Sequence, residues 1–361
     1  MSYDTYYTNA VGLLQSLVST PSFSREESNT AALIQDFFTK NKIGTNRHLN
    51  NVWCVNRHFD SARPSILLNS HHDTVKPNSN YTRDPFMPLI EDGRLFGLGS
   101  NDAGGPLVSL IAAFLYYYDK PGMQFNLVLA ATAEEEISGK NGIESIWPLL
   151  PDIGFAIVGE PTLTNLAVAE KGLLVLDCVV QGRAGHAARE EGENAIYKAL
   201  PDIEWFRTFR FPKVSHTLGP VKMSVTVIGT ANQAHNIVPP ECSFVVDVRV
   251  TDVYTHEEVL DIIKQHVQCR VTPRSMRLRS SYIDIHHPIV QSGLKLGKTT
   301  YGSPTTSDQA LMPVPSLKCG PGDSARSHTA DEYIYLEEIS EGISTYIRLL
   351  APVLMFPGEG V

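Results

Sequence analysis

The chain has 361 residues, of which 42% are hydrophobic and 19% charged, and its formal net charge is -9. This length allows one large or two ordinary domains, and the composition is typical of a soluble globular enzyme. The negative charge argues against nucleic acid or an anionic membrane as the main partner.

Cysteine usage and the N-terminus indicate a reducing compartment. Five cysteines are scattered without a Cys-x-x-Cys pair, which argues against a disulfide framework and a thiolate metal site. The first residues lack a basic region followed by an apolar core, so we expect no signal peptide. The longest apolar stretch, 106–118, is too short to span a bilayer. We therefore expect a cytoplasmic protein without a membrane partner.

Helical and strand-like segments alternate through the first 172 residues. Apolar residues recur at helical spacing at 4–17, 26–40 and 104–118. Ser24, before the second of these segments, is a candidate N-cap. Short apolar runs of strand type lie at 52–59, 66–69, 125–132 and 155–159. Such strands alternating with helices predict a largely parallel sheet covered on both faces.

The pattern changes after residue 172. Strands are predicted at 173–181, 221–228, 242–250 and 271–280, and helices at 194–209 and 256–268. This β-α-β-β-α-β order is the ferredoxin-like arrangement. A helix at 288–298, a strand at 317–320 and a helix at 333–350 then resume the first pattern. We therefore expect an α/β domain made of 1–172 and 286–361, interrupted by an α+β insert at 173–285.

The first chemical motif is Ser70-His71-His72-Asp73, at the end of a predicted strand. Side chains alternate along a strand, so His71 and Asp73 point to the same face. His71 can ligate a metal, and Asp73 can accept the other ring N–H. Taken alone, the motif is explained equally well as a polar turn after a buried strand.

A glycine-rich turn at 97–105 has Asp102 as its only ionisable group. It lacks the Lys-Ser/Thr of a P-loop and the spacing of the dinucleotide fingerprint. The alternative to a metal ligand here is a simple helix N-cap.

Two further strands end in carboxylates. Residues 134–136 are three consecutive glutamates, and they repel one another at the end of a buried strand unless a positive charge is present. Glu160 closes the strand predicted at 155–159. The alternatives are a solvated acidic turn and a plain strand-end turn. His328 follows a later apolar stretch and, taken alone, is explained as a loop histidine.

Together these segments supply two histidines and several carboxylates at strand ends of one sheet. Nitrogen and oxygen ligands without thiolate suit zinc, with cobalt or manganese as alternatives. Two metal ions bridged by one carboxylate are a known means of activating water for hydrolysis.

In this order the motifs resemble those of the co-catalytic zinc amidohydrolases and exopeptidases. That family includes acetylornithine deacetylase, succinyl-diaminopimelate desuccinylase, aminoacylase and glutamate carboxypeptidase. The likeness covers nearly the whole chain. The matching segments are Ser70-His71-His72-Asp73, Asp102, Glu134-Glu135-Glu136, Gly159-Glu160-Pro161 and His328. The resemblance implies a parallel-sheet zinc-peptidase catalytic domain with a ferredoxin-like lid and dimerisation domain inserted at 173–285.

The resemblance also implies two Zn²⁺ ions per chain. The first would be held by His71, Asp102 and Glu160, and the second by Asp102, Glu136 and His328. Glu135 would be the general base, and Asp73 would orient His71.

Further roles are implied for the insert. His186, in the turn at 182–186, would help to bind the oxyanion across a homodimer interface. Asn236 and Arg249 would hold the substrate carboxylate, and Ser307 lies in a loop expected to touch substrate. The chain departs from the family where Asp102-Ala103-Gly104-Gly105 replaces the frequent Asp-x-Lys-Gly. It departs again where Pro304-Thr305-Thr306-Ser307-Asp308 replaces Gly-Gly-Thr-Ser-Asp.

We therefore expect a dinuclear zinc amidohydrolase that removes an acyl group from the α-nitrogen of a small N-acyl amino acid. Its length and insert are most similar to acetylornithine deacetylase, which favours N-acetyl-ornithine and a role in arginine biosynthesis. N-succinyl-ornithine and N-acetyl-citrulline are alternatives. The rival interpretations are a dipeptidase or aminopeptidase of the same fold and a non-catalytic metal-binding protein.

Overall fold

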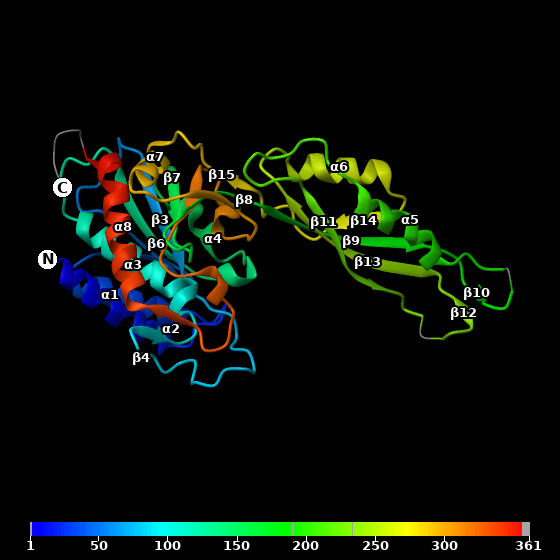
Figure 1. Ribbon diagram of the computed structural model, residues 1–361, viewed down its shortest axis with the longest axis horizontal. Helices are drawn as coiled ribbons and strands as arrows, with labels where there is room; N and C mark the ends of the chain where they lie inside the picture. The colour runs from blue at the N-terminus through cyan, green and yellow to red at the C-terminus, as the bar shows by residue number, and fades with distance from the viewer. Residues whose placement is uncertain (1, 190, 233, 356–361) are drawn as a thin grey trace. The chain divides into compact units, whose positions relative to one another are not determined.

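The chain folds into two compact units. The computed structural model describes residues 2–189, 191–232 and 234–355, and Figure 1 draws their helices and strands. The first unit contains Met1–Val168, Tyr282–Tyr301 and Ser307–Val361. The second contains Ala169–Ser281 and Gly302–Thr306. The second unit thus corresponds to the insert expected at 173–285, with one short segment added. Its role as a lid and dimerisation domain stays a prediction.

The main sheet has a parallel centre. Its nine strands follow the order β1-β2-β6-β3-β7-β17-β8-β15, and β16 also pairs with β8. The four central strands run parallel and are β6 (Asn126–Thr132), β3 (Ser65–His71), β7 (Ile153–Val158) and β17 (Ser316–Lys318). Every residue of β3 and β6 is buried, as expected for strands covered on both faces. The α/β class with a largely parallel sheet is confirmed.

Alternate residues of β3 separate the two faces of this sheet. Ile66 and Leu68 join a core with five helices, whereas Leu67 packs on the opposite face with α4 (Ile143–Ile146). The five helices are α1 (Tyr3–Val18), α2 (Ser28–Lys40), α3 (Gly105–Tyr117), α7 (Pro288–Lys295) and α8 (Leu336–Leu354). Because side chains alternate along a strand, His71 shares the face of Leu67.

The remaining elements of the main sheet and its loops are short. The flanking strands are β1 (Asn46–His48), β2 (Asn51–Val55), β8 (Leu166–Glu170), β15 (Ser281–Tyr282) and β16 (Thr300–Ser303). A separate three-stranded sheet consists of β18 (Tyr333–Tyr335), β5 (Arg94–Phe96) and β4 (Leu89–Glu91). Short helical turns are formed by Ser100–Gly104, Glu135–Ile137, Trp147–Leu149, Asp308–Leu311 and Ser324–Arg326.

The second unit is an antiparallel sheet with two helices. Its strands are β11 (Lys222–Gly229), β13 (Glu241–Val250), β9 (Gly172–Gln181) and β14 (Arg270–Pro273), in that spatial order. Buried residues alternate along β9 and β13 and form one core with α5 (Ala195–Thr208) and α6 (His256–His266). A separate two-stranded antiparallel sheet pairs β10 (Gly185–His186) with β12 (Ile237–Val238). The chain order β9-α5-β11-β13-α6-β14 is the predicted one.

Three local predictions are wrong. Ser24 does not cap α2, since Glu27 occupies the N-cap and the Ser24 hydroxyl instead donates to Asp73 at 2.7 Å. The last strand of the insert ends at Pro273 rather than at residue 280, and proline supplies no N–H for continued pairing. The helix predicted from residue 333 begins at Leu336, because Tyr333–Tyr335 pairs with β5.

None of the helices in the described part of the chain combines the length and apolar character that a bilayer crossing requires.

Candidate metal centre

Three neighbouring strands deliver the predicted ligands to one edge of the main sheet. His71 is the last residue of β3, Glu135 and Glu136 follow β6, and Glu160 follows β7. These strands are parallel and adjacent, so their carboxyl ends meet at the same edge. Asp102 reaches this edge from the turn Ser100–Gly104, which leads into α3.

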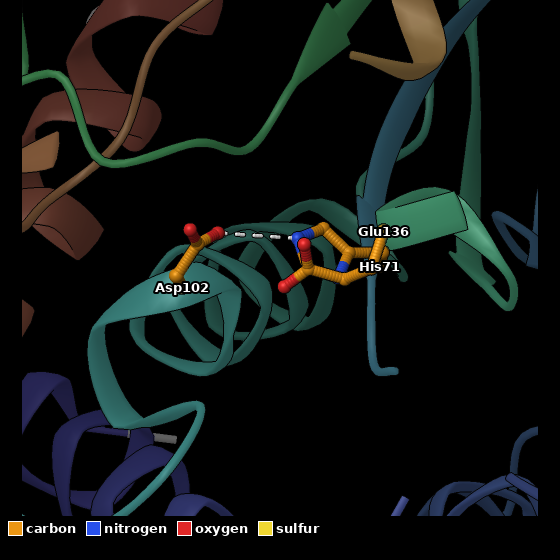
Figure 2. Close-up of side chains that lie close together, drawn as sticks. All are labelled: His71, Asp102 and Glu136. Atoms are coloured by element: carbon orange, nitrogen blue, oxygen red, sulfur yellow. Dashed lines mark hydrogen bonds and ion pairs between the residues drawn. The ribbon is translucent and has the colours of Figure 1, made fainter. Parts of the chain in front are cut away.

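His71 lies at the base of the cluster and is only 1% exposed. Its Nδ1 atom lies 2.9 Å from the backbone oxygen of Asp73 and 3.4 Å from Oδ1 of that residue. Its Nε2 atom lies 3.3 Å from Asp102 Oδ1 (Figure 2). The same atom lies 3.9 Å from Glu160 Oε1. Asp73 thus orients the ring, and the second ring nitrogen points at the two expected partner ligands of the first ion.

A second group forms around the other oxygen of Asp102. The Nε2 atom of His328 lies 3.0 Å from Glu136 Oε2 and 3.8 Å from Asp102 Oδ2. Asp102 therefore offers one oxygen to each histidine. Potential ligand atoms of His71, Asp102 and Glu136 also lie within 4.8 Å of one another. Two groups that share one carboxylate are the arrangement of a bridged pair of metal ions.

These residues fit zinc in donor type and spacing. Zinc accepts imidazole nitrogen and carboxylate oxygen at about 2.0–2.2 Å, so two of its ligand atoms lie roughly 3.4 Å apart in a tetrahedral site. The histidine-to-carboxylate separations in both groups, 3.0–3.9 Å, bracket this value. The buried Oε1 atom of Glu160 has no hydrogen-bond partner among the residues that the structure describes, and a metal ion would satisfy it.

The electrostatics of the cluster also call for cations. Burial, together with the charge of Asp102, raises the pKa of Glu160 to about 8. The hydrogen bond to Glu136 raises the pKa of His328 to about 9. A positive charge bound beside Glu160 would favour its ionised form, which is the form that can ligate a metal.

Glu135 is placed to act as a base. Its backbone N–H donates to Asp73 Oδ1 at 3.0 Å, and its Oε2 atom lies 4.0 Å from His71 Nε2. Burial, followed by the charges of Glu160 and Asp308, raises the pKa of Glu135 well above its ordinary value, although His71 opposes this shift. A carboxylate with a raised pKa beside a water-activating centre suits proton transfer near neutral pH.

Glu134, the first of the three consecutive glutamates, stabilises its own loop. Glu134 adopts a left-handed backbone, with φ of 56°. Its carboxylate accepts from the side chain of Asn141 at 2.8 Å and from the backbone N–H of that residue at 3.3 Å. It thereby closes its own loop onto Asn141.

Sequence reasoning missed two buried carboxylates near the centre. Asp308 accepts hydrogen bonds from Asn69 and Thr132, at 2.8 and 2.7 Å, next to the ends of β3 and β6. Glu332 accepts backbone N–H groups of the turn that carries Asp102. Asp308 follows Ser307, a residue expected to touch substrate, and Glu332 lies four residues after His328. Closeness to these residues in the sequence was the only signal that could have indicated the two carboxylates. Ser307 itself is a buried cap that accepts from Gln309 N–H.

The remaining predicted residues belong to the second unit. His186 is exposed in the two-stranded sheet of β10 and β12, and its Nδ1 atom accepts the N–H of Ala188 at 3.1 Å. Asn236 is exposed and directly precedes β12. Arg249 is half-buried on β13 and makes two hydrogen bonds to Asp247, at 2.8 and 3.0 Å. Their roles toward substrate stay predictions.

Comparison with known sequences identifies a family of peptidases and related amide hydrolases. The model of peptidase family M20/M25/M40 matches residues 67–351. Succinyl-diaminopimelate desuccinylase 2 of Ruegeria sp. (strain TM1040) is 25% identical over 315 residues, which cover 78% of each chain. Succinyl-diaminopimelate desuccinylase of Acidiphilium cryptum is 27% identical over 218 residues, 57% of this chain and 58% of the relative.

Solved structures share the fold. A tripeptidase from Staphylococcus aureus superposes with a TM-score of 0.76 at 19% identity, covering 96% of this chain and 98% of the other. A dinuclear metal-binding M20 peptidase from Bacillus subtilis gives a TM-score of 0.73 at 13% identity, covering 96% and 98%. At these identities the likeness establishes the fold alone.

Proposed function

Because this chain belongs to peptidase family M20/M25/M40, we propose that it is a zinc-dependent amidohydrolase that deacylates the α-nitrogen of an amino acid. The favoured substrate is N-acetyl-ornithine, with N-succinyl-ornithine and N-acetyl-citrulline as alternatives, and the favoured role is in arginine biosynthesis. The preference for an acyl group over a peptide is supported by the desuccinylase relatives, which share more sequence with the chain than the peptidase structures do.

The observation that carries the proposal is the position of Glu135 beside the expected ligands. When bound, two ions supply Lewis-acid polarisation of the amide carbonyl and lower the pKa of water at the site. Glu135 accepts the proton of the attacking water as the C–O bond forms. It then returns this proton to the nitrogen as the C–N bond breaks, which releases a carboxylic acid and an amine. The acid loses the second proton of the water to the amine, so the final products are a carboxylate and an ammonium group.

Substrate contacts are proposed for Arg249 and Asn236 of the second unit and for Ser307 of the first. Arg249 would pair with the α-carboxylate, a contact in which guanidinium offers two parallel N–H donors. Asn236 and Ser307 would add hydrogen bonds. His186 of a second copy would donate to the oxyanion that develops on the amide oxygen.

A homodimer through the second unit is supported by an exposed edge. β11 lies at the edge of its sheet, and its Val227 and Ile228 are 58% and 54% exposed. Long exposed edge strands are normally covered, and pairing of two copies is one common way.

The test is a panel assay of the zinc-loaded protein. The panel contains N-acetyl-ornithine, N-succinyl-ornithine, N-acetyl-citrulline, N-acetyl-lysine, N-succinyl-diaminopimelate and several dipeptides. We expect the highest kcat/KM for an N-acyl-ornithine. Preference for dipeptides with a free α-amine would favour the peptidase alternative, and no turnover by protein that binds two ions would favour a non-catalytic role.

A further inference from the structure

Glu332 is a buried carboxylate that the ligand set does not explain. It is 2% exposed. Its Oε1 atom accepts the backbone N–H groups of Asn101 and Asp102, at 2.8 and 2.9 Å. Its Oε2 atom accepts the N–H of Gly99 at 3.1 Å. A side chain that accepts three backbone N–H groups fixes the turn that presents Asp102, because it ties Gly99, Asn101 and Asp102 to one carboxyl group.

The same residue belongs to the loop that carries His328, four positions earlier. The backbone oxygen of Glu332 accepts the N–H of Gly97 at 2.9 Å. Asn101 adds a second connection, because its side chain accepts from Asp323 N–H and donates to the Asp323 backbone oxygen, both at 3.1 Å. The loop at 323–332 and the turn at 97–102 are therefore joined at both ends.

The position of His328 depends on these contacts between the loop and the turn more than the positions of His71 and Glu160 do. Its side chain is 56% exposed, and its backbone is left-handed, with φ of 60°. His71, in contrast, is the last residue of a central strand, and Glu160 follows another. The sheet itself fixes the backbone of these two residues.

We propose that Glu332 is a positioning residue that sets the separation of Asp102 and His328, the two ligands of the second ion that lie on loops. The inference rests on the two-ion assignment of the proposed function. Its consequence is asymmetric: loss of Glu332 weakens the second ion much more than the first, because His71 and Glu160 still hold the first. Removal of such a supporting partner typically lowers metal affinity by about 10- to 100-fold.

The experiment titrates the metal-free, full-length protein with Co²⁺ and follows the visible absorption of the bound ion. The variants are Glu332→Gln and Glu332→Ala. Glutamine keeps one oxygen for Asn101 and Asp102 but turns a donor toward Gly99, so its effect should be the smaller. The matched control is Glu341→Gln. The Glu341 carboxylate accepts hydrogen bonds from Lys298 and Thr164, neither of which is an expected metal ligand. Thermal unfolding of each metal-free variant checks its fold.

In wild type and control we expect two equivalents of Co²⁺ to bind. In the Glu332 variants the first equivalent should bind within about threefold of wild type, and the second about 10- to 100-fold more weakly, with an altered spectrum. Wild-type affinity at both steps, or equal weakening of both, would overturn the role of Glu332. Binding of fewer than two equivalents by the wild type would instead overturn the two-ion assignment itself.

Discussion

The Oδ1 atom of Asp73 accepts the backbone N–H of Glu135 at 3.0 Å. The same carboxylate accepts the N–H of Glu136 at 3.2 Å and lies 3.4 Å from His71 Nδ1. Asp73 is fully buried, and its side chain connects the histidine expected to ligate a metal to the loop that carries the expected base. Its role is wider than the orientation of His71 that the sequence predicts.

We therefore expect Asp73→Asn to impair both metal binding and turnover. Asparagine offers one acceptor oxygen, so one backbone N–H of the glutamate loop would face the donor side of the amide. Metal affinity should fall by about 10- to 100-fold, as for other partners of ligating histidines. Isothermal titration with Zn²⁺ measures this loss, and Asp119→Asn, an exposed change in the same unit, serves as control. Unchanged affinity and turnover would remove Asp73 from the account.

Glu135 should contribute to turnover and not to metal binding. Glu135→Gln keeps the size of the side chain and removes its basicity, so we expect two bound ions and nearly unchanged KM. Turnover should fall by about 100-fold or more, the scale of general base catalysis. Metal analysis and steady-state kinetics on the same preparation provide the measurement. A metal-replete variant with near-normal kcat would show that the base lies elsewhere.

Arg249 should provide discrimination for a free α-carboxylate. We expect amidated substrates to be poor for the wild type, and Arg249→Ala to lose that preference, mainly through KM. Arg249→Lys should not restore it, because lysine lacks the planar pair of donors. Arg274→Ala is a suitable control. Arg274 pairs with Asp177 just as Arg249 pairs with Asp247, and both ion pairs lie on the same sheet. Equal wild-type activity on amide and free acid would contradict this assignment.

His186 should act in the active site of a second copy. His186→Ala and Glu135→Ala homodimers should each be nearly inactive. A mixed dimer would contain one doubly altered site and one intact site, so refolding the two variants together should restore up to roughly a quarter of wild-type activity. Light scattering establishes the dimer, and subunit exchange is followed with labelled chains. If subunits exchange and activity does not recover, His186 acts in the active site of its own chain or has no role in catalysis.

Much of the fold and ligand set could be predicted because the signals are local. Apolar runs specify the central strands, and strand ends in a parallel sheet must meet at one edge, so the sequence predicts that His71 and Glu160 lie at that edge. The ligand role of Asp102 was implied by the family resemblance, because its glycine-rich turn alone also allowed a helix N-cap. Each of these assignments depends on a few consecutive residues.

The supporting interactions could not be predicted, because they join distant segments. Glu332 is 230 positions from Asp102, whose N–H it accepts, and Asp308 is 239 positions from Asn69. The residue types alone do not distinguish the three consecutive glutamates, and only the family resemblance assigned roles to Glu135 and Glu136. The structure adds that Glu134 has a left-handed backbone and that its carboxylate accepts from Asn141.

The central claim is that Asp102 bridges two ions, and metal analysis of Asp102→Ala tests it most directly. The variant and the control Asp119→Ala should be loaded with Zn²⁺, freed of excess metal and measured by plasma emission. We predict two ions per chain in the control, and marked loss at both sites with loss of activity in Asp102→Ala. Retention of two ions and of activity by a folded Asp102→Ala protein would contradict the bridged centre.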